Sequence, residues 1–167
     1  MPPILVTGAA GFIGSHTVDQ LLAAGHTVTG VDNFRTGRRA NLGPAATSPR
    51  FTLHEADVAQ PAVLERIVAA ARPDAIIHLA ALVSVQESMQ DPGLNFALNV
   101  QATHFVAEAA RSHQVRRLVF ASSAAIYGDT TDLPIRETAA PRPISPYGAA
   151  KLASEALLLG HGAAFGL

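Results

Sequence analysis

The sequence predicts an α/β protein in which helices cover both faces of a doubly wound parallel sheet. Short runs of β-branched and other apolar residues alternate with segments that are rich in alanine and leucine and have a helical period. The short runs are apolar through their middle, as expected of strands that are buried on both faces. Strands and helices that alternate in this way form parallel sheets through right-handed crossovers.

Five runs predict strands, at residues 4–7, 27–31, 51–55, 75–79 and 118–122. Four segments of helical period predict helices, at residues 12–24, 61–71, 95–113 and 146–159. Ser145 and Pro146 suit the N-cap and first-turn positions of the last helix, and Gly160 predicts its end. The glycine and proline content of residues 35–50 and 128–145 predicts two loops.

Residues 161–167 follow the last expected helix and lie where another parallel strand would begin. Each earlier helix returns the chain to the sheet, so we expect the sheet to be incomplete at its C-terminal edge.

The composition fits one compact domain that works on small molecules. Of the 167 residues, 49% are apolar and 15% are charged, which is enough to form a buried core. The net charge of −1, without a basic block, argues against a nucleic acid or a membrane as partner. The chain has no cysteine, its histidines show no metal-ligand spacing, and no apolar stretch reaches the ~18 residues of a membrane span. We therefore expect a cytoplasmic protein without a metal.

A glycine-rich turn joins the first strand to the first helix. Gly8, Gly11 and Gly14 occupy it, with Phe12 and Ile13 between the last two glycines. Small residues let the backbone approach a pyrophosphate, and the helix N-terminus offers free N–H groups and a positive dipole end. The spacing is one residue longer than the common dinucleotide fingerprint, and glycines at a strand end can also be purely structural.

Asp32 closes the second strand, 18 residues after the last glycine of the turn. A carboxylate there accepts hydrogen bonds from the adenosine ribose and repels a 2′-phosphate, which favours NAD over NADP. Arg35 could accommodate a 2′-phosphate, but we interpret it with Arg38 and Arg39 as part of a solvated loop face. Asp57, which follows the third strand, fits two interpretations equally well: contact with the adenine, or the N-cap of a helix.

Tyr147 and Lys151 lie four residues apart near the start of the last helix, so both project from one face. A free tyrosine has a pKa of about 10, and a neighbouring ammonium group favours its phenolate, which can then take a proton from a hydroxyl. The alternative is an ordinary exposed pair. Ser123 ends the fifth strand, where its hydroxyl could hold the reacting oxygen, and alternation along the strand lets only one of Ser122 and Ser123 face the site.

Together these motifs resemble the extended short-chain dehydrogenase/reductases, specifically the NAD-dependent sugar-nucleotide epimerase/dehydratase family typified by UDP-glucose 4-epimerase. The resemblance covers essentially the whole chain and depends on residues 7–14, 32–33, 57–58, 78–81, 99, 122–123, 127–128 and 147–151. It implies a Rossmann fold that binds NAD and acts on a UDP-sugar or another nucleotide sugar.

The resemblance also implies roles for individual residues. Ser123, Tyr147 and Lys151 would be catalytic, and Ser84, Ser123 and Tyr147 would bind substrate. His78 would be a packing residue. The implied contacts to NAD are Gly8, Gly11, Phe12, Ile13, Gly14, Asp32, Asn33, Asp57, Val58, Leu79, Ala80, Ala81, Asn99, Tyr147 and Lys151.

The reaction is narrowed by two departures from the family pattern. Relatives that dehydrate or decarboxylate a sugar usually carry acidic residues directly after the catalytic serine or threonine, where this chain has Ala124 and Ala125. A 4-epimerase, whose 4-keto intermediate turns over and is reduced on its other face, needs no such residue. Val83 stands where some UDP-galactose-type relatives carry a lysine, which favours the broader epimerase group over the close galactose epimerase subtype.

Family members are commonly about twice as long. The resemblance therefore implies an NAD-binding domain over residues 1–160, a tail over residues 161–167 and no substrate domain within this chain. Two alternatives to the epimerase follow: an NAD-binding module without catalysis, and a dehydratase or reductase of the same family.

A homodimer is also implied, through helices 95–113 and 146–159. An apolar stripe on the first of them could serve this contact or could pack on the sheet: Leu98, Ala102, Phe105, Val106 and Ala109.

Overall fold

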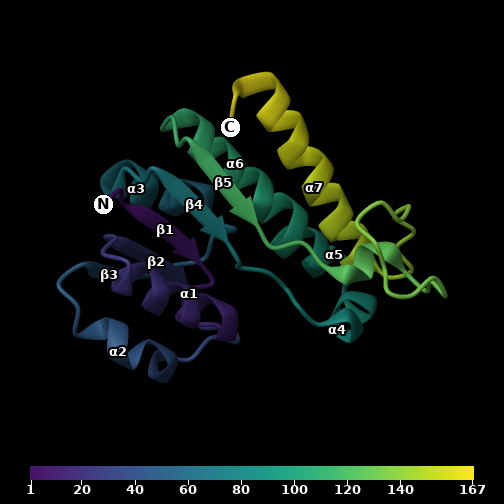
Figure 1. The fold of residues 1–167 in the computed structure, drawn as a ribbon, viewed down its shortest axis with the longest axis horizontal. Helices are drawn as coiled ribbons and strands as arrows, with labels where there is room; N and C mark the ends of the chain where they lie inside the picture. Colours follow the sequence, from purple (N-terminus) through teal and green to yellow (C-terminus); the bar gives the residue numbers. More distant parts are fainter.

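A computed structural model describes all residues, 1–167, and contains one parallel sheet flanked by helices (Figure 1). The strands are β1 (Ile4–Thr7), β2 (Val28–Asp32), β3 (Phe51–Glu55), β4 (Ala75–His78) and β5 (Arg117–Phe120). Their order in the sheet is β3-β2-β1-β4-β5. The chain builds outward from β1 to β3 and then crosses back to β4. The direction of winding therefore reverses between β1 and β4, which is where ligands bind in such sheets.

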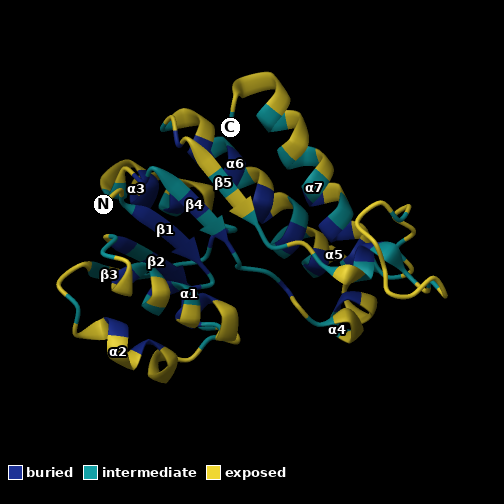
Figure 2. Ribbon diagram, in the orientation of Figure 1, coloured by how far each residue is buried: buried dark blue, intermediate teal, exposed yellow.

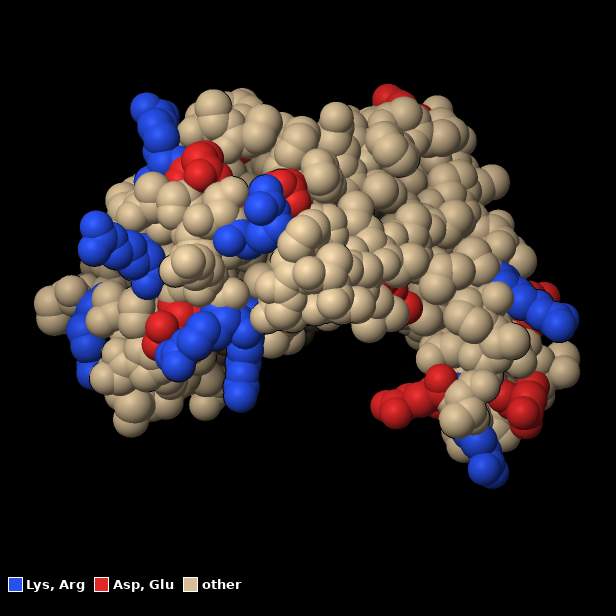
Figure 3. All heavy atoms as spheres, turned by 90° about the horizontal axis from the view of Figure 1, so that it is seen from above, with Lys and Arg blue, Asp and Glu red and all other residues tan.

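The helices are α1 (Phe12–Ala23), α2 (Gly43–Ala46), α3 (Pro61–Ala71), α4 (Val85–Gln90), α5 (Pro92–Asn95), α6 (Ala102–Ser112) and α7 (Pro146–Phe165). No helix is both long enough and apolar enough to cross a membrane. On the face of the molecule drawn in Figure 3, basic and acidic side chains are intermixed and no block of one sign forms.

Two cores lie on opposite faces of the sheet because successive side chains of a strand point to opposite sides. Leu5 of β1 packs with residues of α3 and α6, whereas Ile4 and Val6 pack with residues of α1. The central strands are accordingly buried in Figure 2, while α7 is exposed along much of its outer side. The prediction of a doubly wound sheet is confirmed.

The five strands and the helices at 12–24 and 61–71 agree with their predicted bounds to within two residues. The helix expected at 95–113 is confirmed as an unbroken helical segment from Pro92 to Ser112, but it begins earlier than predicted and its first turns are not regular α-helix. Its first residue belongs to α5, and a wide π-helical stretch, Phe96–Gln101, joins α5 to α6. Within that stretch, the carbonyl oxygen of Asn99 accepts hydrogen bonds from the hydroxyls of Thr103 and Ser154. Side chains that bond into the helix ladder in this way are a known cause of local distortion.

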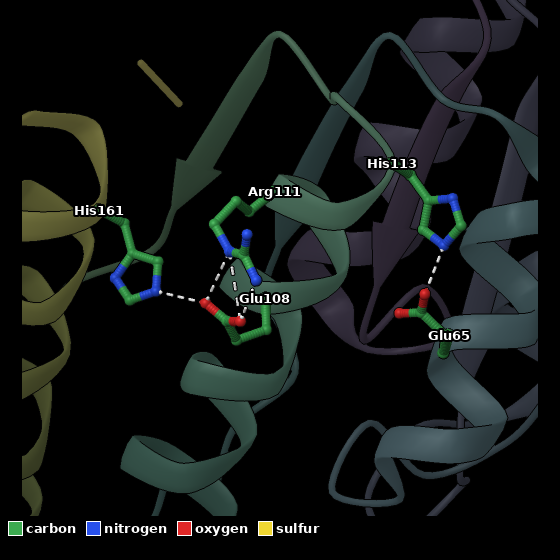
Figure 4. Close-up of polar contacts among 5 residues, drawn as sticks. All are labelled: Glu65, Glu108, Arg111, His113 and His161. Carbon is green, nitrogen blue, oxygen red and sulfur yellow. Dashed lines mark hydrogen bonds and ion pairs between the residues drawn. The ribbon is translucent and has the colours of Figure 1, made fainter. Parts of the chain in front are cut away.

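The predicted start of α7 is confirmed, because the Ser145 hydroxyl accepts a hydrogen bond from the Gly148 amide at 3.1 Å. Its predicted end at Gly160 is wrong. The helix continues to Phe165 and ends at Gly166, which has a φ of 73°. Packing explains the extra turn, since Nε2 of His161 lies 3.0 Å from a Glu108 carboxylate oxygen on α6 (Figure 4). Residues 161–165 of the expected tail are therefore helical.

Two further segments differ from expectation. The expected loop at 35–50 contains a 3-10 turn, Arg39–Leu42, and the short helix α2. Helix α4 was not predicted.

The open edge of the sheet is as expected, because β5 pairs with β4 alone and Val119 of β5 is 54% exposed.

Candidate functional site

A cleft of about 480 Å³ lies at the carboxyl ends of the strands, around the reversal between β1 and β4. Its volume falls in the ordinary range of small-molecule sites. It is lined by the glycine turn, the ends of β2 and β3, the residues after β4 and β5, and the start of α7. Segments that are far apart in sequence thus meet in one place.

The glycine turn has a shape that side chains would prevent. Gly8 has a φ of 68°, and a Cβ atom there would lie 2.8 Å from the Ala80 nitrogen. A Cβ on Gly14 would lie 2.0 Å from the carbonyl oxygen of Gly8. At the start of α1, the amides of Phe12 and Ile13 have no acceptor within the chain. The turn therefore offers free N–H groups that line an open cleft.

Asp32 is buried beneath the cleft at the end of β2. Its carboxylate accepts hydrogen bonds at 2.8 Å from the amides of Ala10 and Phe34, so it braces the glycine turn as well as lining the cleft. Asn33 beside it donates to a carboxylate oxygen of Asp57 at 3.0 Å.

Asp57 lines the cleft and accepts a hydrogen bond from the Ala59 amide at 2.8 Å. The N-cap of α3 is Gln60, so the interpretation of Asp57 as that cap is wrong. Val58 also lines the cleft.

Lys151 and Tyr147 line the opposite end of the cleft, on the first turns of α7. The Lys151 side chain is buried, and its Nζ donates to the carbonyl oxygen of Ala121 at 3.0 Å. Nζ also lies 4.7 Å from the ring centre of Phe120 and 5.9 Å from that of Tyr147. Burial lowers the pKa of Lys151 to about 8. The structure thus places one cation beside the tyrosine.

Ser123 lies close by in sequence, but its hydroxyl does not line the cleft. It accepts a hydrogen bond from the Ala125 amide at 3.2 Å and caps the 3-10 turn Ala124–Tyr127. Its neighbour Ser122 lines the cleft instead. The structure therefore joins Tyr147 and Lys151 with the glycine turn but leaves the Ser123 hydroxyl in a local turn.

Asn99 and Ser84 also lie outside the lining. The amide side chain of Asn99 exchanges hydrogen bonds at 3.0 Å with the backbone N–H and carbonyl of Leu82, and so holds the segment after β4. The Ser84 hydroxyl accepts a hydrogen bond from the Glu87 amide and caps α4. The predicted contact residues Leu79, Ala80 and Ala81, in contrast, do line the cleft.

His78 is buried under the cleft floor between two threonines. Nδ1 lies 2.7 Å from the Thr7 hydroxyl, and Nε2 lies 3.1 Å from the Thr103 hydroxyl. The Thr103 hydroxyl donates to the carbonyl of Asn99, so Nε2 must carry the proton. Burial and, secondarily, the charge of Lys151 lower the pKa of His78 to about 3. The ring is a neutral packing group.

Several residues of the lining were missed, among them Arg35, Thr36 and Gly37 after β2. Their position directly after a strand of the sheet was the signal that could have identified them. Arg35 is exposed, as expected of the loop face, and it also lines the cleft and pairs with Glu87 on α4. Arg38 and Arg39 are exposed as expected.

Comparisons with known proteins agree with this arrangement. Residues 4–167 match the model of the NAD dependent epimerase/dehydratase family. The chain is 45% identical to a UDP-glucose 4-epimerase of Mycolicibacterium smegmatis over 92% of its own length, and 40% identical to one of Lacticaseibacillus casei over 98%. It covers 49% and 48% of those proteins, so the chain spans about half the length of the curated relatives it matches.

Solved structures give the same result. The UDP-glucose 4-epimerase of Thermotoga maritima with UDP-glucose matches 99% of this chain at a TM-score of 0.92 and 37% identity. The Thermus thermophilus UDP-glucose 4-epimerase in complex with NAD matches 99% at 0.92 and 41% identity. The chain covers 52% of each of these two structures.

Proposed function

The chain belongs to the NAD-dependent epimerase/dehydratase family, and from this premise we propose that it is the NAD-binding part of a nucleotide-sugar 4-epimerase. The observation that carries the proposal is the position of Tyr147 and Lys151, which line the same cleft as the glycine turn and Asp32. The reaction is supported by relatives named UDP-glucose 4-epimerase, which match nearly the whole chain. UDP-hexoses are accordingly the proposed substrates.

The residues present fit NAD. The glycine turn leaves room that a Cβ atom would fill, and the free amides of α1 suit a pyrophosphate. Asp32 would receive the adenosine ribose, with Asn33, Asp57 and Val58 around the adenine. When bound, NAD supplies a ring that accepts hydride from a sugar carbon and returns it.

Tyr147 is the proposed base, which takes the proton of the sugar 4-hydroxyl and later gives it back. Lys151 is the only lysine of the chain, and its ammonium group stabilises negative charge on a neighbouring phenol. Ser123 is proposed to hold the reacting hydroxyl, which requires its side chain to leave the Ala125 amide and turn toward the cleft. Ser84 is the second proposed contact to substrate.

Ala124 and Ala125 favour epimerisation within the family, because neither can deliver or remove a second proton. A dehydrogenase would release free NADH during turnover and a reductase would release free NAD, whereas an epimerase keeps its cofactor bound and reoxidises it. The second candidate, an NAD-binding module without catalysis, is favoured by one observation: the Ser123 hydroxyl caps a local turn and does not line the cleft.

We also propose a homodimer through α6 and α7. The apolar stripe on α6 is mostly core, since Ala102, Val106 and Ala109 are buried. Support comes instead from α7, where Leu159 is 75% exposed and Phe165 is 58% exposed. Sedimentation equilibrium checks the proposal: a dimer that Leu159→Glu dissociates would support it, and a monomer at all concentrations would contradict it.

The proposed reaction is tested by proton NMR of UDP-glucose and UDP-galactose interconversion. Tyr147→Phe should lower the rate by about 10²–10⁴, the usual contribution of a general base, while NAD binding is retained. Tyr127→Phe is the matched control, because Tyr127 is the only other tyrosine and does not line the cleft. An unchanged rate for Tyr147→Phe would contradict the proposed base. NAD binding without interconversion of any UDP-hexose pair, with or without any sequence that follows Leu167, would favour the module.

A further inference from the structure

We propose that Glu87 is a specificity residue for the cofactor: by holding Arg35 in an ion pair, it keeps this guanidinium from receiving a 2′-phosphate and so enforces NAD over NADP. The inference rests on the proposed function only in requiring that the cleft bind a dinucleotide. Arg35 is the one arginine that lines the cleft, and it follows Asp32 by three residues.

The pair is built from two parts of the fold that face each other. Both nitrogens of the Arg35 fork meet the Glu87 carboxylate, with Nη1 3.4 Å from Oε2 and Nη2 paired with Oε1. Each side chain is 35% exposed. Bidentate pairs of this kind fix the direction in which the guanidinium points. The fork of Arg35 is therefore occupied.

Local backbone contacts hold both partners in place. The amide of Arg35 donates to the Asn33 side-chain oxygen at 3.0 Å, and the amide of Glu87 donates to the Ser84 hydroxyl at 3.1 Å. Because the backbone is anchored at each end, the ion pair follows from the fold and from the choice of Glu at position 87.

Charge at this end of the cleft disfavours a phosphate. Asp32 and Asp57 line it, and Glu87 adds a third carboxylate against the single guanidinium of Arg35. A phosphomonoester carries nearly two negative charges at neutral pH and needs an unpaired cation. Arg39 offers none, because it does not line the cleft and it pairs with Glu55.

The test measures the dissociation constants of NAD and NADP by titration calorimetry on the 167-residue chain. In Glu87→Gln, the ratio of the NADP constant to the NAD constant should fall about five- to tenfold, the effect of one partly exposed charge-assisted contact. Glu55→Gln is the control, since it removes the same charge from a more exposed arginine–glutamate pair outside the cleft. The ratio of the two dissociation constants in this control should stay within about twofold of the wild-type ratio. In Arg35→Ala/Glu87→Gln the ratio should return to the wild-type value.

Three results would overturn the inference: an unchanged ratio in Glu87→Gln, an equal fall in Glu55→Gln, or a fall that persists without Arg35. Thermal unfolding of each variant verifies that it is folded. A wild-type chain that binds neither cofactor would refute the proposed function and this inference together, whereas wild-type binding of NAD with an unchanged ratio in Glu87→Gln would refute this inference alone.

Discussion

Replacement of Lys151 by Met should stabilise the chain at neutral pH while it removes a functional group. Burial lowers the pKa of Lys151 from its ordinary 10.5 to about 8. At 1.36 kcal/mol for each pKa unit, the buried charge costs the folded state about 3 kcal/mol. The variant also leaves the Ala121 carbonyl without its donor, which costs about 1–3 kcal/mol. The expected net gain at pH 7 is about 1 kcal/mol.

The pH dependence is a sharper test than the gain itself. Between pH 8 and 10.5 the unfolded chain still holds the Lys151 proton while the folded chain has lost it, so the stability of the wild type rises with pH. Above this window the neutral amine carries no burial penalty and still hydrogen-bonds Ala121. The advantage of Lys151→Met should therefore fall by about 3 kcal/mol between pH 7 and pH 11 and change sign.

Urea denaturation, followed by circular dichroism at pH 7, 8, 9, 10 and 11, measures the difference in free energy of unfolding between Lys151→Met and the wild type. Lys151 is the only lysine, so no other lysine titrates in this range. Leu152→Met, one position along α7, is the control and should differ from wild type by a constant amount. A Lys151→Met difference that is equally constant with pH would refute the reasoning.

Three further predictions concern other parts of the fold. Gly160→Ala should stabilise the chain by about 0.5–1 kcal/mol in urea denaturation, because Gly160 lies inside α7 and an added Cβ atom would meet nothing within 4 Å. Destabilisation would contradict the observed helix. Gly14→Ala should lower the free energy of unfolding by about 1–3 kcal/mol and weaken NAD binding, since the added Cβ would lie 2.0 Å from the carbonyl oxygen of Gly8. Gly43→Ala is the control: its Cβ would meet nothing within 4 Å, and NAD binding should be unchanged. Hydrogen bonds from Arg111 and His161 lower the pKa of Glu108 to about 2, so Glu108→Gln should cost less than about 1 kcal/mol at pH 7 for this partly exposed group. That cost should disappear as the pH falls from 4.5 toward 2, and an unchanged cost at low pH would contradict it.

The parts of the fold that sequence predicts well are those fixed by neighbouring residues. Strand β1 and the glycine turn are defined by a short apolar run and by glycines within the next few residues. The start of α7 is similarly local, because Ser145 caps an amide three residues away. Such features depend on propensity and pattern, and the sequence contains both.

Long-range contacts decided the features that were mispredicted. Gly160 is a stop signal by itself, but the contact of His161 with Glu108, 53 residues away, carries α7 past it. The π-helical stretch at Asn99 involves Ser154, 55 residues away. Arg35 and Glu87 are 52 residues apart, so the sequence alone could not show that the arginine is paired. Alternation correctly limited Ser122 and Ser123 to one lining residue, but it could not choose between them.

The central claim is that the cleft between β1 and β4 holds NAD beside Tyr147 and Lys151. The chain labelled with ¹³Cε-lysine has a single lysine resonance, which comes from Lys151 inside the cleft. On titration with NAD we expect this resonance to shift and saturate as one site fills, and we expect no comparable shift in Gly14→Ala. A resonance that does not respond to NAD in the folded wild-type chain would contradict the account.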